Sequence, residues 1–495
     1  MFDALRDWLS ANYHWIVLAV VLHLIVLGTV AYLILLERKI ASWAQDRIGP
    51  NRTGLGFGII PILKNFKFWG LGQPMADGLK LFLKEDYRPK HVDRILFSLA
   101  PMVMITVIII SIATLPWGGW VGKTEAFDVT SAVASNPGNA EAAKKASIKL
   151  IESQLPAGNA LVAEPQNFKE TLNGDGSKTV TAEASHGWMF QIANLNIGVL
   201  YILATLSLAV YGVVIGGYAS NNKFSFLGGL RATANMISYE IPLGLAVLAI
   251  VLMYGTLNLA ELVEVQAHSW YGILPAWNVF CQPLCFVMFL ICILAEANRA
   301  PFDIAEAEQE LVGGYHTEYS SMRLALLLLA EYAGMITTSA ICVALFFGGW
   351  DFPGLRGHLN PAHPSLTDSI WVAIARAAVF YGKALLIISV FMWVRWSLPR
   401  FRFDQIMTLA WRGLIPIALL QLVATALVIY AWGDSSREHM RLNGWHALQL
   451  LGVNVLLVFI VMIGSTFLPP APQTNRRTHV AGSRFNETAL PASLN

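Results

Sequence analysis

The stretch "YHWIVLAVVLHLIVLGTVAYLILLERK", residues 13–39, decides the class of fold. It is longer than the apolar core of a secretory signal peptide and has no small-residue cleavage site before its charged end. About 20 apolar residues are enough to cross a bilayer. The stretch is therefore expected to stay in the protein as a first membrane-spanning helix.

The rest of the chain repeats this pattern. Of its 495 residues, 55% are hydrophobic and 13% are charged, against about 25% charged in soluble domains. Long apolar runs recur at about 14–36, 95–115, 195–218, 236–255, 273–295, 322–347, 371–395, 412–432 and 445–467. The sequence predicts an all-α polytopic transmembrane bundle of about nine spanning helices and no separate soluble catalytic domain.

Positive charge predicts the orientation of this bundle. Lys and Arg are concentrated in the loop at 37–93 and again at 397–412, while the connection at 255–272 has neither. Positive residues favour the cytoplasmic side. This places the N-terminus in the periplasm and, with nine spans, the C-terminal tail in the cytoplasm.

Four regions follow from composition and hydropathy. Residues 1–115 hold the first two helices and a cytoplasmic loop, 37–93, expected to contain surface helices. Residues 116–190 form a polar periplasmic insert that reads as low-complexity sequence. Residues 191–432 form the core bundle with an acidic loop at 296–321, and residues 433–495 add a ninth helix and a tail.

Several ionisable residues fall within the predicted spans, among them Glu240, Glu331 and Lys383. A charge there costs at least about 2.5–3.5 kcal/mol unless it faces protein or water. One interpretation is a set of isolated structural pairs. The other is a proton relay, because a buried glutamate with no adjacent arginine holds its proton more readily.

The segment "AEANRAPFDIAEAEQE", residues 295–310, places five acids and one arginine directly after an apolar run. On a helix Glu296 and Arg299 would share a face and could pair. The remaining glutamates would lack cations, and crowded carboxylates cannot all ionise cheaply. A solvated acidic loop and a segment folded back against the bundle both stay open. The acids are Glu296, Asp303, Glu306, Glu308 and Glu310.

The first loop begins "ERKIASWAQDRIGPNRTG" at residue 37 and ends "QPMADGLKLFLKED" at residue 86. Apolar and aromatic residues alternate with lysines between these segments, as in chains lying along a membrane surface. The pattern fits either an interfacial anchor or the mouth of a pocket for an amphiphile.

These segments, with "NLNIGVLYILATLSLAVYG" at 194–212, "GGYASNNKFSFLGGLRATANMISYE" at 216–240 and "LPRFRFDQIMTLAW" at 398–411, closely resemble one family. It is the NADH dehydrogenase subunit 1 family, the H subunit of proton-pumping NADH:quinone oxidoreductase, which is respiratory complex I. The resemblance covers most of residues 14–432.

The resemblance implies a multi-pass subunit of the bacterial plasma (inner) membrane, placed between the hydrophilic quinone-reducing arm and the antiporter-like membrane arm. Quinone would be the substrate, and the flavin and iron-sulfur clusters would belong to partner subunits. The chain would thus be part of a translocase without a complete active site of its own. It would bind no nucleic acid. The residues implied to line or shape the quinone chamber are Arg38, Trp43, Arg47, Arg52 and Asp77, with Arg299 nearby.

The resemblance also implies a carboxylate relay from the chamber toward the antiporter-like subunits, made of Glu240, Glu296, Glu306, Glu308, Glu310, Glu318 and Glu331. We add Lys383 because of its place within a predicted span. Arg400, Arg402 and Asp404 match the family's motif and would suit docking of the hydrophilic arm. The four cysteines lie in apolar runs without cluster-like spacing, and no metal site is predicted.

The sequence departs from the family pattern in the insert at 116–190, in the long first loop and in the ninth helix. Two other classes stay open: the membrane component of a related hydrogenase or formate hydrogenlyase, and a proton or cation transporter. The nearly complete chamber motif favours quinone over hydrogenase, and the sequence offers no dedicated substrate site for a transporter.

Overall fold

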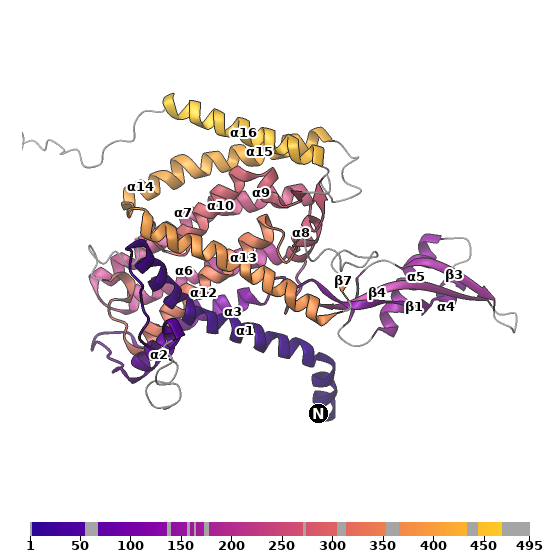
Figure 1. The fold of residues 1–495 in the computed structure, drawn as a ribbon, viewed down its shortest axis with the longest axis horizontal. Helices are drawn as coiled ribbons and strands as arrows, with labels where there is room; N and C mark the ends of the chain where they lie inside the picture. The colour runs from indigo at the N-terminus through magenta and orange to yellow at the C-terminus, as the bar shows by residue number, and fades with distance from the viewer. Residues whose placement is uncertain are drawn as a thin grey trace, which may run out of the picture.

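The computed structural model shows a bundle of long helices with a small β-structure at one end (Figure 1). It describes residues 2–54, 68–135, 140–155, 159–162, 165–172, 178–270, 274–303, 313–352, 366–367, 369–432 and 444–467. Within these ranges eight helical segments are long and apolar enough to cross a membrane. The predicted polytopic helical bundle is therefore confirmed, and the chain is a multi-pass membrane protein.

The long helices follow the predicted apolar runs closely, because a chain in lipid must satisfy its backbone hydrogen bonds within each segment. They are α1 (Phe2–Ala44), α3 (Arg94–Ile112), α6 (Gly198–Ala219), α7 (Lys223–Tyr254), α12 (Ser321–Phe346), α13 (Ile370–Ser397), the continuous run of α14 (Phe403–Thr408), η5 (Leu409–Leu414) and α15 (Ile415–Trp432), and α16 (Gly444–Phe467).

The predicted span at 273–295 is broken. Short α9 (Asn278–Cys281) ends at Gln282, and α10 (Pro283–Glu296) begins on Pro283. Proline suits the first turn of a helix but has no N–H to continue an earlier one. The 14 residues of α10 rise about 21 Å, less than the roughly 30 Å of a bilayer core.

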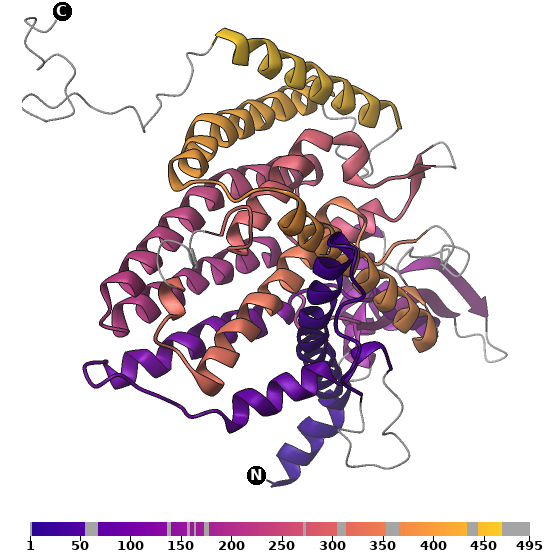
Figure 2. The same ribbon diagram turned by 60° about the vertical axis from the view of Figure 1, so that its left-hand side comes forward.

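Helix α12 lies at the centre of the bundle. It packs against α3, α13 and α1, and its second half, from Met335 to Phe346, is continuously buried. The ninth predicted helix, α16, lies alongside α15 at the edge of the bundle (Figures 1 and 2). Asn454 of α16 accepts a hydrogen bond from Gln421 of α15 at 3.2 Å. This buried amide contact joins α16 to the bundle.

The connections gather at the two ends of the bundle as the charge pattern predicts. Helices α2 (Gln73–Leu83) and α14 lie at one end, together with the C-terminal end of α10 (Figure 1). Helix α8 (Leu259–Gln266) and the β-structure lie at the other. Which of these ends faces the cytoplasm stays a prediction.

The insert contains a sheet, which its interpretation as low-complexity sequence does not predict. Its strands are β1 (Trp120–Asp128), β2 (Ala160–Leu161), β3 (Gln166–Leu172), β4 (Lys178–Met189) and β7 (Leu366–Thr367), accompanied by α4 (Thr130–Ala134) and α5 (Ala140–Gln154). Strands β1 and β4 pair antiparallel from Trp120↔Met189 to Asp128↔Thr181, β2 and β3 pair with β4, and β7 lies parallel to β1.

A small core holds the insert together. Val180, Ala182 and Ala184 alternate along β4 and are buried against Val129 and Ile151. This period of two is the pattern of a strand with one covered face. Two short strands, β5 (Ser269–Trp270) and β6 (Leu274–Pro275), and two 3₁₀ turns, η2 (Phe68–Gly70) and η3 (Gly314–His316), complete the described structure.

Candidate functional site

The first loop is tied to the end of α1 by a chain of polar contacts. Arg38 of α1 donates to Asp77 of α2 at 2.7 Å. Gln73 donates to the same carboxylate at 3.0 Å and accepts from Thr53 at 2.6 Å. This first-loop network, Arg38, Asp77, Gln73 and Thr53, joins the ends of two helices to the loop between them.

A cavity of about 570 Å³ lies directly beside this network. It is lined by residues 48–53 and Gln73. Gly70 has a φ of 86°, and a Cβ there would lie 2.5 Å from the carbonyl oxygen of Pro50. Only glycine accepts both that backbone region and that approach. The close contact holds the turn before α2 against the cavity wall.

Some of the predicted chamber residues contact this network or line the cavity, and others are exposed. Asp77 and Arg38 are in direct contact, and Arg52 lines the cavity. Trp43 is 57% exposed and Arg47 is exposed as well. The structure therefore brings Arg38, Asp77 and Arg52 to one place. It leaves Trp43 exposed in the last turn of α1 and Arg47 exposed in the loop that follows.

A buried ionic cluster lies on the other side of the α1 end. Glu37, next to Arg38 in sequence, lies 3.2 Å from Arg299 and also pairs with Arg395 of α13. Tyr332 of α12 donates to Glu37 at 2.6 Å, and Arg299 lies 3.5 Å from Glu331. Two glutamates and two arginines thus balance in charge within one buried group.

The placement of Arg299 corrects the predicted pairing with Glu296. Helix α10 ends at Glu296, and Asn298 takes a φ of 48° before the cis peptide between Ala300 and Pro301. Asparagine is one of the few residues that adopts this left-handed conformation readily. The turn carries Arg299 away from the α10 face and toward Glu37.

Glu331 likewise differs from the expectation of a glutamate without an adjacent arginine, since it pairs with Arg299. The side chains of Arg299, Glu37 and Glu331 are only 8–9% exposed. Burial lowers the pKa of the Arg299 guanidinium, but Glu331, Tyr332 and Glu37 raise that pKa above its ordinary value. Arg299 is therefore a fixed positive charge between two acids.

A second acidic group lies between α7 and α10. Glu240 of α7 and Glu296 at the end of α10 are both half-buried, and these two helices pack against each other. Ser207 of α6 donates its hydroxyl hydrogen to Glu240. Two carboxylates in such a setting repel one another when both are ionised.

Glu318 lies just after η3 and accepts a hydrogen bond from Asn222 at 2.7 Å. That contact ties it to the N-terminal end of α7. The other predicted relay acids, Glu306, Glu308 and Glu310, lie outside the described residues.

Lys383 has the contacts of a helix cap. Its ammonium group donates to the carbonyl oxygens of Phe347, Gly349 and Asp351 at 2.8, 2.9 and 2.6 Å. These carbonyls follow the C-terminus of α12, where a positive charge is favourable. All three acceptors are backbone carbonyl groups, which do not titrate. The relay role of Lys383 stays a prediction.

The three predicted docking residues lie at the same end as the first-loop network. Arg400 and Arg402 lie between α13 and α14, and Asp404 lies in the first turn of α14. Arg400 pairs with the buried Asp303 at 2.6 Å. Arg402 and Asp404 lie 3.5 Å apart, and both are more than one-third exposed. Arg400 therefore holds the turn after α10, while the other two residues face outward.

The sequence analysis did not identify four residues of these two groups: Gln73 of the first-loop network, and Glu37, Tyr332 and Arg395 of the buried ionic cluster. Glu37 stands in the quoted "ERK" run directly after the first predicted span, and Arg395 is the last residue of the predicted span at 371–395. Charged residues are common at such positions, so neither gives a distinct signal. Within the described ranges, no group of three or more His, Cys, Asp or Glu side chains is arranged to hold a metal ion.

The family model and the similar proteins that match this chain point to the same family. The family model for NADH dehydrogenase matches residues 17–137 and 177–426. The chain is 39% identical over 393 residues to the NADH-quinone oxidoreductase H subunit 1 of Cytophaga hutchinsonii, covering 79% of this chain and 90% of the relative. It is 37% identical over 430 residues to the NADH-quinone oxidoreductase H subunit of Leptospira biflexa, covering 86% and 98%.

Proposed function

Because the chain belongs to the NADH dehydrogenase family, whose matched members are named as the H subunit of NADH-quinone oxidoreductase, we propose that it is that membrane subunit. In this role it forms the quinone entrance, one wall of the quinone chamber and part of a proton relay. Electrons from NADH reach the quinone through the flavin and iron-sulfur clusters of partner subunits.

One observation carries this proposal: two consecutive residues of α1 serve two different networks. Arg38 reaches Asp77 beside the first-loop cavity, while Glu37 reaches Arg299 in the buried ionic cluster. Neighbouring positions on a helix point about 100° apart. A change of charge in the cavity therefore acts on the buried cluster through a single turn of α1.

Helix α2 supports a membrane entrance for an amphiphile. Met75, Leu79, Phe82 and Leu83 are each more than half exposed. Their spacing of four, three and one residues places them on one face of the helix. A helix with such a face lies in the membrane interface, where it would guide the apolar tail of a quinone toward the cavity.

The proton relay would begin at the ionic cluster. Reduction of a quinone adds negative charge and takes up protons, so it changes the field at Arg38 and Asp77. The cluster of Glu37, Arg299 and Glu331 would respond by rearranging its pairs, and a proton would move along Glu240 and Glu296. Glu318 and the acids at 306, 308 and 310 complete the proposed relay toward the antiporter-like subunits.

The exposed pair of Arg402 and Asp404 is a suitable contact for the hydrophilic arm. It lies at the same end of the bundle as the first-loop network. In this arrangement the membrane is the bacterial inner membrane, with the N-terminus on the periplasmic side and the tail in the cytoplasm.

The test is to purify the intact complex through a tag on this chain and to measure inhibitor-sensitive NADH:quinone activity. Co-purification of NADH-oxidising subunits together with that activity is the expected result. A complex that evolves hydrogen and ignores quinone would replace the proposal by a hydrogenase or formate hydrogenlyase component. A chain that transports cations without any redox partner would refute both.

A further inference from the structure

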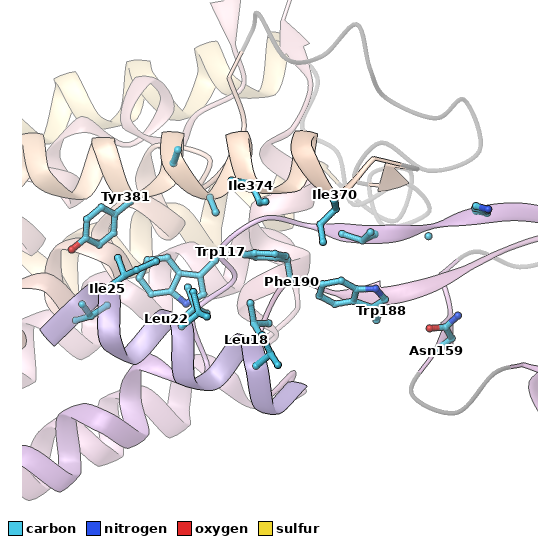
Figure 3. A pocket seen from close by; sticks show the side chains of 18 of the residues that line it. Leu18, Leu22, Ile25, Trp117, Asn159, Trp188, Phe190, Ile370, Ile374 and Tyr381 are labelled. Atoms are coloured by element: carbon cyan, nitrogen blue, oxygen red, sulfur yellow. The ribbon is translucent and has the colours of Figure 1, made fainter. Parts of the chain in front are cut away.

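An apolar groove lies at the end of the bundle opposite the first-loop network, between α1, α13 and the sheet of the insert (Figure 3). Its volume is about 1240 Å³, above the roughly 300–1,000 Å³ of ordinary small-molecule sites. Aliphatic side chains such as Leu22 and Ile374 form the walls, and Trp117 and Phe190 lie between them in Figure 3. We call it the insert groove.

The insert groove opens toward the lipid. Val17, Val21 and Ile25 of α1 are 45–55% exposed, and Ile370 and Ile374 of α13 are 43–48% exposed. Apolar surface of this kind, facing outward from two spanning helices, is in contact with hydrocarbon rather than with water. A molecule in the groove would therefore come from the bilayer.

The length of the groove matches one leaflet. Its wall on α1 runs from Val17 to Val26, a rise of about 14 Å. Half of a roughly 30 Å hydrocarbon core is about 15 Å. The groove thus ends near the middle of the membrane, where lipid chains end and where a partner's spanning helix would have to continue.

The outer end of the groove carries positive charge. Lys123 of β1 stands opposite His186 of β4, and Val121 stands opposite Trp188. Residues two apart on a strand share a face, as do opposed residues of paired strands. One face of the two strands therefore changes from apolar at Val121 and Trp188 to cationic at Lys123, moving away from the bundle.

Lys123 is available to a ligand. Its side chain is exposed and makes no ion pair with the described part of the chain. The nearby acid, Glu125, lies 3.3 Å from Nε2 of His186. An ammonium group at the outer end of an apolar groove is complementary to a phosphate joined to hydrocarbon chains.

Aromatic residues mark this level as the membrane surface. Trp15 and Trp188 are in edge contact at 6.0 Å, and Trp371 at the start of α13 is 75% exposed. Tryptophan is enriched where hydrocarbon meets the headgroups. The cationic end of the groove therefore lies just beyond this boundary, at the depth of lipid phosphates.

Two glycines keep the strands close at this point. Gly122 and Gly187 are opposed, and a Cβ on Gly122 would lie 2.0 Å from the carbonyl oxygen of His186. The close pairing fixes Lys123 and His186 over the end of the groove. Strands β1 and β4 then continue outward past Trp188 (Figure 3), so a partner helix laid along the groove would meet them.

We propose that the insert groove binds one phospholipid of the adjacent leaflet, with its acyl chains between α1 and α13 and its phosphate at Lys123. This site is separate from the proposed quinone chamber, which lies at the other end of the bundle. In this proposal, strands β1 and β4 of the insert hold the lipid phosphate at the membrane surface.

The test uses the intact complex in bilayers containing phosphatidylglycerol with a photoactivatable group in one acyl chain. Irradiation should label peptides from 17–26 and 370–381. Ala378→Trp fills the groove and should abolish this labelling, whereas Leu386→Trp, at a 69% exposed position of the same helix outside the groove, should leave it intact. Quinone reductase activity should stay unchanged in both variants.

Lys123→Glu tests the headgroup contact without filling the groove. A charge-assisted hydrogen bond contributes about 1.5–3 kcal/mol, so lipid retained by the detergent-purified complex at this site should fall at least about tenfold. Lys149→Glu, at an exposed lysine of α5 in the same insert, is the matched control and should have no effect. Equal labelling in wild type and Ala378→Trp, unchanged retention in Lys123→Glu, or a partner protein crosslinked along the groove would each overturn the proposal.

Discussion

Replacement of Arg299 by glutamine is the sharpest test of the buried ionic cluster. Arg299 lies 3.2 Å from Glu37 and 3.5 Å from Glu331, and all three side chains are less than one-tenth exposed. Its loss leaves two acids with Arg395 as the remaining cation of the cluster. Removing one partner of a buried ion pair costs about 3–5 kcal/mol.

We therefore expect Arg299→Gln to reduce the amount of assembled complex in membranes and to shorten the thermal half-life of its quinone reductase activity. Adding Glu331→Gln restores the balance of charge and should recover part of both. Coupling between contacting residues is about 0.5–3 kcal/mol. The double variant should thus be more stable than the two single losses predict when they are added.

The pH dependence of the stability of Arg299→Gln is a second test of the cluster. With one acid unbalanced, protonation of that acid removes the excess negative charge, so the stability of Arg299→Gln should rise relative to wild type as pH falls. Arg88→Gln, which breaks a pair with Asp86 that is more than 40% exposed on both sides, is the control. It should cost at most about 1 kcal/mol. Wild-type stability in Arg299→Gln, or strict additivity with Glu331→Gln, would refute the cluster as described.

Two further predictions concern the first loop and the turn after α10. Asp77→Asn should raise the KM for quinone without lowering thermal stability, because its pair with Arg38 is partly exposed and contributes at most about 1 kcal/mol; an unchanged KM would remove Asp77 from the chamber. Arg400→Ala should remove the ion pair that Arg400 makes with the buried Asp303 and release the hydrophilic arm at lower salt in a detachment assay, whereas Arg94→Ala, at an exposed position at the start of α3, should not.

The spanning helices could be predicted from sequence because hydropathy is a local property. Each run of about 20 apolar residues carries its own signal. The break at Gln282 was present in the sequence as Pro283, but a proline near the start of an apolar run is also compatible with an unbroken helix.

The pairing of Arg299 could not be predicted because it depends on distant residues. Glu37 is 262 positions away in the chain, and the nearer candidate, Glu296, is lost only because α10 ends there and Asn298 turns the backbone. The sheet of the insert was missed for a different reason. Its buried alternation uses Ala182 and Ala184 beside Val180, and alanine carries little strand signal.

In the proposed mechanism, carboxylates near the ionic cluster couple quinone reduction to proton movement. The most direct measurement is the ratio of protons moved to NADH oxidised in vesicles containing complex with Glu296→Gln or Glu240→Gln. Glu261→Gln, at an exposed acid of α8 at the opposite end, is the control. We predict a lower ratio in the first two variants and a normal ratio in the control. Normal assembly with an unchanged ratio in both Glu296→Gln and Glu240→Gln would rule out this coupling.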